Sequence, residues 1–189
     1  MRTAVVILNW NTAEYLKAFL PGVYESCEGV ADLYVADNAS TDGSVAVLTG
    51  EFPGVKSVLL DRNYGFTGGY NRVLAQLEDY EYFVLLNSDI EVDKGWLEPL
   101  IEWMDSHPHC GVCGPKLHGL IAKEEGGYER TNTFEYAGAA GGLLDRYGFP
   151  YCRGRILSKV AEDKGQYDSP ADVLWVTGAC LVTRASLWK

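Results

Sequence analysis

The sequence predicts an α/β fold with a mostly parallel central sheet and helices on both faces. Short runs that are apolar throughout, as in strands buried on both faces, alternate with segments whose apolar residues recur at helical spacing. This alternation favours right-handed crossovers between parallel strands. The chain has 189 residues, of which 47% are apolar, so it is long enough for one domain with a substantial core.

The first predicted elements are a strand and the helix that follows it. Ala4 to Leu8 form a continuous apolar and mostly β-branched run, as expected of a buried strand. Apolar residues then repeat at helical spacing from Tyr15 to Tyr24, with Asn11 as the expected N-cap and Glu14 three residues later. We expect Pro21-Gly22 to kink or end this helix.

The alternation continues to about residue 117 and then stops. Further strands are predicted at 32–36, 55–60, 82–86 and 112–117, and further helices at 45–48, from the 63–71 turn to about 77, and at 96–104. Glycines interrupt the pattern from 118 to about 170, where only small strands or hairpins are expected. A buried strand is predicted again at 173–182.

Composition limits the function classes that the chain can serve. The formal net charge is −10, and no local basic stripe is visible, so we expect no nucleic acid partner. No apolar run approaches the roughly 20 residues that a membrane span needs, and the first apolar run is too short for a signal peptide. The expected location is therefore the cytoplasm, where the five scattered cysteines would stay reduced.

Polar residues stand where predicted strands end. Asn9, Asp37, Asn87 and Asp89 each follow an apolar run, and ligands of parallel sheets bind outside the carboxyl ends of the strands. The hard oxygens around Asp89 suit Mg²⁺ or Mn²⁺ bound together with diphosphate oxygens. The alternative interpretation is that both aspartates cap the helices that follow.

The turn from Asn63 to Asn71 is the second candidate ligand site. Glycines at 65, 68 and 69 would let the backbone approach a ligand closely at a helix N-terminus. Their spacing does not fit the G-x-G-x-x-G dinucleotide fingerprint. A flexible connection without a ligand is the alternative.

Five segments that appear in order carry a family resemblance. They are Val5–Asn11, Asp37–Ser44, Asn63–Asn71, Leu85–Asp89 and Gly178–Arg184. Together they resemble the family 2 inverting glycosyltransferases of the GT-A fold, in particular the rhamnosyltransferase-like bacterial branch that builds surface polysaccharides. The segments span nearly the whole chain, and their order makes the resemblance specific.

The resemblance implies a role for each matching position. Asp37 would hydrogen-bond the pyrimidine base of a UDP- or dTDP-sugar donor, and the turn from Asn63 would lie along the nucleotide. Asn87-Ser88-Asp89 occupies the place of the family's Asp-x-Asp metal motif, so Asp89 is expected to make most of the contact to Mg²⁺ or Mn²⁺. The complete set expected at the donor is Asn9, Asp37, Asn63, Gly65, Asn71, Asn87, Ser88 and Asp89.

The resemblance also implies how the chain is organised. Residues 1–189 would form a single GT-A domain, with a nucleotide-sugar-binding half at 1–117 and an incomplete acceptor-side half at 118–189. The family's general base lies in an acidic segment after the Gly-Ala strand and its arginine, so we expect it beyond Lys189, in a longer enzyme of which this chain is a truncated form. No catalytic residue is assigned. The acceptor would be a glycan or a lipid-linked glycan, with peripheral membrane association of the full-length protein.

Two other functions stay open from the residues. A sugar-nucleotide nucleotidyltransferase shares strand-edge carboxylates and metal, but its glycine-rich phosphate loop should follow the first strand, where residues 9–12 contain no glycine. A non-catalytic nucleotide-binding module is the third hypothesis. The transferred sugar, the acceptor and the oligomeric state are not predicted.

Overall fold

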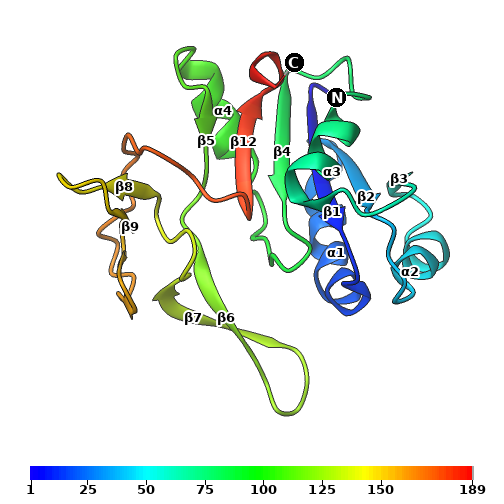
Figure 1. Cartoon of the computed structure of the whole chain (residues 1–189), viewed down its shortest axis with the longest axis horizontal. Helices are drawn as coiled ribbons and strands as arrows, with labels where there is room; N and C mark the ends of the chain where they lie inside the picture. The colour runs from blue at the N-terminus through cyan, green and yellow to red at the C-terminus, as the bar shows by residue number, and fades with distance from the viewer. Residues whose placement is uncertain (189) are drawn as a thin grey trace. The chain divides into compact units, whose positions relative to one another are not determined.

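A computed structural model describes residues 1–188 of the chain (Figure 1). The chain folds into two compact units. The first comprises residues 1–113 and the segment from Gly178 onward, and the second is Gly114–Thr177. The strand nearest the end of the chain therefore belongs to the same sheet as the first strand.

The first unit is built on a six-stranded sheet with the order β3-β2-β1-β4-β12-β5. Its strands are β1 (Thr3–Asn9), β2 (Asp32–Asp37), β3 (Lys56–Leu59), β4 (Tyr82–Leu86), β5 (Val112–Cys113) and β12 (Cys180–Arg184). The pairs β1–β2, β1–β4 and β2–β3 are parallel, whereas β12 runs antiparallel to both β4 and β5. The prediction of a mostly parallel sheet is confirmed, with one reversed strand.

Helices cover both faces of this sheet (Figure 1). They are α1 (Ala13–Cys27), α2 (Ser44–Glu51), α3 (Gly65–Leu74) and α4 (Glu98–Ser106), and a short 3₁₀ helix spans Ala185–Leu187. Tyr70, Val73 and Leu74 of α3 pack against Ala4 and Val6 of β1. Side chains alternate along a strand, so Val5 and Ile7 face the opposite side, where α1 and α4 lie.

The second unit consists of small antiparallel sheets. Strands β6 (His118–Ala122) and β7 (Tyr128–Phe134) form a hairpin, and β8 (Gly142–Leu144), β9 (Pro150–Cys152), β10 (Arg155–Ile156) and β11 (Lys159–Val160) form a four-stranded meander. Phe134, Ala139 and Cys152 are its buried apolar core. The expectation of small strands and hairpins in this region is confirmed.

The start and course of α1 differ from the prediction. Asn11 is not the N-cap: the helix begins at Ala13 after Thr12, and Asn11 has a left-handed φ of 55°. The helix also does not end at Pro21 but continues to Cys27. Leu20 and Val23 are buried on either side of the proline, so packing against the sheet offsets the one backbone hydrogen bond that proline cannot donate.

Two strand predictions were wrong in their bounds. The strand expected at 112–117 is only Val112–Cys113, and the one expected at 173–182 is Cys180–Arg184. Residues 173–177 instead belong to the second unit, where Trp175 makes an isolated bridge with Gly142. Both apolar runs bridge two units, and a run of buried residues does not reveal where one unit passes into the next.

Among the described residues, no helix has the length and apolar character needed to cross a membrane.

Candidate functional site

The ends of β1 and β2 are joined by a buried pair of side chains. Asn9 Nδ2 donates a hydrogen bond to Asp37 Oδ1 at 2.8 Å, and Asp37 Oδ2 accepts one from the Ser40 backbone N–H at 2.8 Å. Asn9 is 0% exposed and Asp37 is 2% exposed. A buried carboxylate needs such donors, because burial without them is costly. Asp37 therefore holds a turn and does not cap α2, whose N-cap residue is Gly43.

The same asparagine connects this pair to the end of β4. Its Oδ1 accepts a hydrogen bond from the Thr12 hydroxyl, and that hydroxyl lies 2.9 Å from the Ser88 hydroxyl. Asn9 Nδ2 also contacts the Ser40 hydroxyl at 3.1 Å. The ends of three parallel strands are thus linked through one chain of polar side chains, as the polar residues at the strand ends led us to expect.

The predicted nucleotide turn is held by an asparagine that follows Asp37. Asn38 Nδ2 donates to Asn63 Oδ1 at 2.9 Å and to the Gly65 carbonyl at 3.2 Å, and Asn38 Oδ1 accepts from the Tyr64 N–H at 2.9 Å. Asn63 Oδ1 also accepts from the Gly65 N–H at 2.7 Å. Gly65 has φ +68°, a conformation that suits glycine. The turn is thus tied to the end of β2 and is not a free connection.

The segment Asn87-Ser88-Asp89 leaves the sheet beside the start of β12. The Asn87 N–H donates to the Ala179 carbonyl at 2.8 Å, which extends the β4–β12 ladder by one residue. Asn87 and Ser88 are half-buried, and Asp89 is exposed. A carboxylate thus points into solvent next to the linked strand ends.

Comparison with known proteins decides the family. Residues 4–156 match the model of Glycosyl transferase family 2. The chain belongs to this family.

Individual relatives agree with the assignment. The N-acetylglucosaminyl-diphospho-decaprenol L-rhamnosyltransferase of Mycobacterium tuberculosis is 23% identical over 192 residues, which cover 96% of this chain. The chain spans about 61% of that relative's length.

Solved structures share the fold at lower coverage. S. aureus TarS 1-349 matches with a TM-score of 0.55 and 22% identity over 65% of this chain and 37% of that chain. The mannosyltransferase PcManGT from Pyrobaculum calidifontis, in complex with GDP-Man and Mn2+, matches with a TM-score of 0.52 and 20% identity over 65% of this chain and 36% of that chain. The predicted GT-A glycosyltransferase fold is confirmed.

The oxygens of residues 87–89 suit the divalent cation that the sequence predicts, with Asp89 as the single carboxylate ligand. Among residues 1–188, no group of three or more His, Cys, Asp and Glu side chains is placed to hold a metal ion. Each carboxylate oxygen of Asp37 accepts one hydrogen bond, Oδ1 from Asn9 and Oδ2 from the Ser40 N–H. Carboxylate, hydroxyl and amide oxygens at 87–89 are ligands that Mg²⁺ and Mn²⁺ accept. This set of oxygens suits a divalent cation, which Asp89 would hold.

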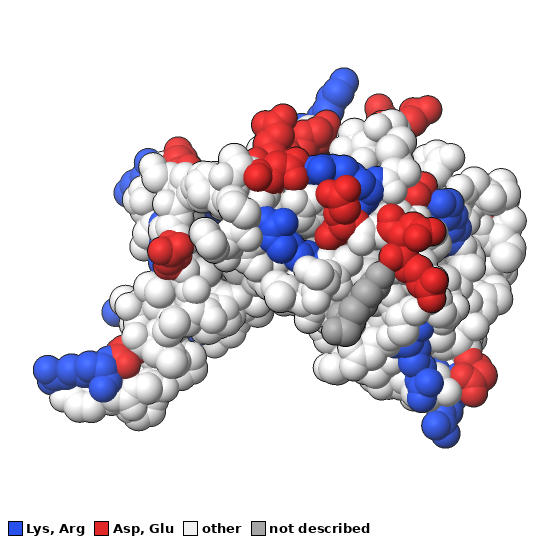
Figure 2. Space-filling model, turned by 90° about the horizontal axis from the view of Figure 1, so that it is seen from above, with Lys and Arg blue, Asp and Glu red and all other residues white. Residues whose placement is uncertain are grey.

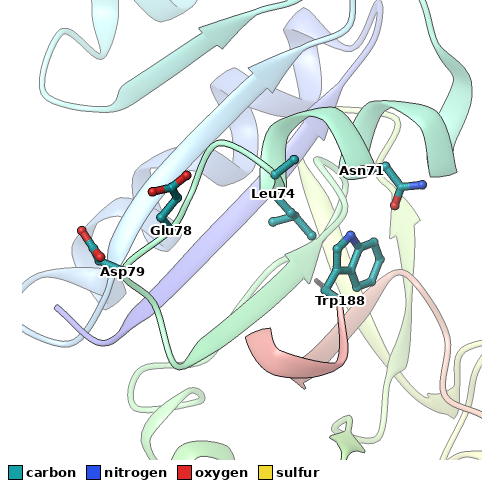
Figure 3. Close-up of a pocket in the computed structure, with 6 residues that line it drawn as sticks. Asn71, Leu74, Glu78, Asp79 and Trp188 are labelled. Carbon is teal, nitrogen blue, oxygen red and sulfur yellow. The ribbon is translucent and has the colours of Figure 1, made fainter.

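Asn71 lies in α3 and lines a hollow of its own. This hollow, of about 660 Å³, is also lined by Leu74, Ala75, Glu78, Asp79 and Trp188. Figure 3 shows Asn71 near Trp188, and the two carboxylates toward the other end of the hollow. None of Asn9, Asp37 and Asp89 lines this hollow, and among the described residues Asn71 has no side-chain hydrogen bond to the linked strand ends, so its role at the donor stays a prediction.

Sequence reasoning did not single out three residues that organise the site. Thr12 and Ser40 supply hydroxyls to the Asn9 linkage, and Asn38 holds the turn at 63–65. Short polar residues directly after apolar strands were the available signal. Arg72 was also missed: its guanidinium lies 3.7 Å from the centre of the Tyr64 ring and places a cation beside the turn.

The wider surface carries both signs of charge. Figure 2 shows acidic and basic side chains interleaved on one face, with no continuous basic stripe on that face. Any phosphate bound by this acidic chain must therefore be neutralised locally, by a cation or by single basic residues such as Arg72.

Proposed function

We propose that the protein transfers a sugar, with inversion, from a UDP- or dTDP-sugar to a glycan or lipid-linked acceptor in surface polysaccharide synthesis. The observation that carries the proposal is the linkage of Asp37, Asn9, Thr12 and Ser88 across the ends of three parallel strands. Relatives support it: one is a rhamnosyltransferase named for a decaprenol-linked substrate, and S. aureus TarS 1-349 was solved in complex with UDP-GlcNAc.

The residues divide between the parts of the donor. Asp37 is fixed at the end of β2, and each carboxylate oxygen keeps a further lone pair for an N–H of the pyrimidine base. The turn at Asn63 and Gly65 follows the nucleotide, and Asp89 faces the diphosphate. The site thus orders base, ribose and diphosphate along the carboxyl edge of the sheet.

The reaction is a single displacement. The acceptor hydroxyl oxygen bonds to the anomeric carbon while the bond from that carbon to the diphosphate oxygen breaks, and the hydroxyl proton passes to a base. Mg²⁺ or Mn²⁺ held by Asp89 would neutralise the charge of the departing nucleoside diphosphate. We place the activity in the cytoplasm, with peripheral association of the full-length protein with the membrane that carries the acceptor.

Titration calorimetry with UDP and dTDP, in MnCl₂ and in EDTA, tests the proposal. We expect the parent to bind in Mn²⁺. Asp37→Asn should lose at least about tenfold in affinity, because a buried charge-assisted hydrogen bond is worth about 1.5–3 kcal/mol. Asp89→Asn should lose the dependence of binding on Mn²⁺. Glu51→Gln, an exposed carboxylate at the end of α2, is the matched control and should bind as the parent does.

Two results would contradict the proposal. One is a parent protein that binds neither diphosphate in either condition. The other is release of pyrophosphate from UTP or dTTP in the presence of a sugar 1-phosphate, which would indicate a nucleotidyltransferase. Thermal unfolding of each variant separates a lost contact from a lost fold.

A further inference from the structure

Phe66, in the first turn of α3, touches Gly178 just before β12. A Cβ atom added at Gly178 would lie 2.8 Å from Cζ and 3.2 Å from Cε1 of the Phe66 ring, closer than ordinary contact allows. The ring also packs edge-on against Tyr70, with centroids 4.9 Å apart. Only a residue without a side chain leaves room for Phe66 in this position.

The contacts of Tyr70 place the Phe66 ring near the edge of the sheet where β1, β2 and β4 end. The Tyr70 hydroxyl is buried and donates to the carbonyl of Leu86, the last residue of β4, at 3.2 Å. Since α3 runs back from the strand ends, Phe66 lies one turn nearer to those ends than Tyr70 does.

The strand register shows where along the sheet the contact between Phe66 and Gly178 lies. Leu86 pairs with Cys180 in the antiparallel ladder, and Asn87 N–H bonds to the Ala179 carbonyl. Continued by one residue, this register sets Gly178 level with Ser88. The contact between Phe66 and Gly178 therefore lies beside the Asn87-Ser88-Asp89 segment.

Half of Phe66 remains open to solvent. Its exposed fraction is 50%, although a large apolar ring gains by burial. An isolated exposed phenylalanine would need no explanation. This ring is held from two sides, by Tyr70 and Gly178, and the strand register sets Gly178 level with Ser88.

We propose that Phe66 is the apolar wall against which the sugar of the donor packs, and that Gly178 keeps the ring in place. Pyranose rings carry one face of C–H groups, and aromatic side chains are the usual apolar lining of small-molecule sites. The ligand class is therefore a neutral hexosyl or deoxyhexosyl group. This inference rests on the proposed function, because a sugar lies beside Asp89 only if the diphosphate does.

The test compares nucleotides with and without the sugar. Kd values of UDP, UDP-glucose, dTDP and dTDP-rhamnose are measured in MnCl₂ for the parent and for Phe66→Ala. Phe66→Ala should weaken both sugar nucleotides by about three- to tenfold relative to their diphosphates, the size expected of one aromatic packing contact. Trp103→Ala, an exposed ring on α4 stacked on His107, is the control and should leave this ratio unchanged.

The partner glycine gives an independent check. Gly178→Ala should displace the Phe66 ring and so lower the affinity for the sugar nucleotides relative to their diphosphates. The double variant should lose no more of this relative affinity than Phe66→Ala alone. The double variant should also unfold at a higher temperature than Gly178→Ala, because it no longer has the clash between the added Cβ at position 178 and the Phe66 ring.

The outcomes separate the two proposals. If Phe66→Ala weakens the binding of the diphosphate and of the sugar nucleotide equally, or weakens neither, the proposal that Phe66 packs against the sugar is wrong. The proposed nucleotide site is not affected by that result. If the parent binds no pyrimidine nucleotide, both are overturned.

Discussion

The carboxylate of Asp42 accepts a hydrogen bond from the backbone N–H of Ala13, 2.8 Å away, at the first residue of α1. It also accepts the N–H of Ser44, at 3.0 Å, and the Ser44 hydroxyl, at the start of α2. Desolvation opposes ionisation, but these donors outweigh it and lower the pKa of Asp42. One side chain therefore caps two helices, and α1 is capped from a residue 29 positions later.

Replacing Asp42 should destabilise the first unit. Asp42→Ala removes the acceptor from both helix starts, and we expect a loss of about 1–2 kcal/mol in the free energy of unfolding. Asp42→Asn keeps an acceptor oxygen without the charge and should lose less. Urea unfolding at pH 7 measures both, and equal stability of Asp42→Ala and the parent would contradict the capping role.

Asn9 should matter more for stability than its neutral side chain suggests. Asn9→Ala leaves the buried Asp37 carboxylate without its side-chain donor, which should cost about 2–3 kcal/mol. Asn71→Ala, at an exposed position of α3, should stay within about 0.5 kcal/mol of the parent. Similar losses for the two variants, measured by urea unfolding, would refute the importance of the Asn9–Asp37 pair.

Local sequence patterns were sufficient for the strands that are buried on both faces. The strand predicted at 82–86 matches β4. Asn9 and Asp37, the last residues of β1 and β2, do meet at one edge, where Thr12 connects them to Ser88 after β4. Both results follow from local rules, because an uninterrupted apolar run defines a buried strand and parallel strands share an edge.

Tertiary contacts decided what the sequence could not predict. Asn11 has the composition of an N-cap, yet its side chain accepts the Thr41 N–H, and Asp42 caps α1 instead. Pro21 breaks isolated helices, but α1 keeps its buried face through it. Asn71 shares a turn with Asn63 in sequence and still lies at the hollow beside Trp188, because the helical turns of α3 separate them.

Gly69 sets the distance between α3 and β1. A Cβ atom there would lie 2.8 Å from both Cδ atoms of Leu8. Gly69→Ala should therefore cost about 1–3 kcal/mol through overpacking. Gly50→Ala in α2 meets no atom within 4 Å and should instead stabilise by about 0.5–1 kcal/mol, because alanine has the higher helix propensity. Thermal unfolding distinguishes the signs, and stabilisation by both substitutions would contradict the close packing.

Asp163 should make the second unit sensitive to acid. Hydrogen bonds from Lys116, the Gly165 N–H and His118, at 2.6, 2.9 and 2.8 Å, outweigh desolvation and lower the pKa of Asp163 to about 2. The unfolded carboxyl titrates near about 3.9. The folded pKa is the lower one, so the stabilisation is complete above the unfolded pKa and is lost as the pH falls toward 2.

Asp163→Asn lacks this titration, so the parent should be the more stable protein at pH 7, and the difference should shrink as the pH is lowered through 4 toward 2. Urea unfolding followed by NMR signals of β6 and β7 measures it. Glu129→Gln, which removes a pair with Lys123 at 4.0 Å between two exposed side chains, is the control and should show little difference at any pH. A gap between Asp163→Asn and the parent that is the same at pH 3 and pH 7 would mean that the Asp163 carboxylate does not stabilise the hairpin through its charge.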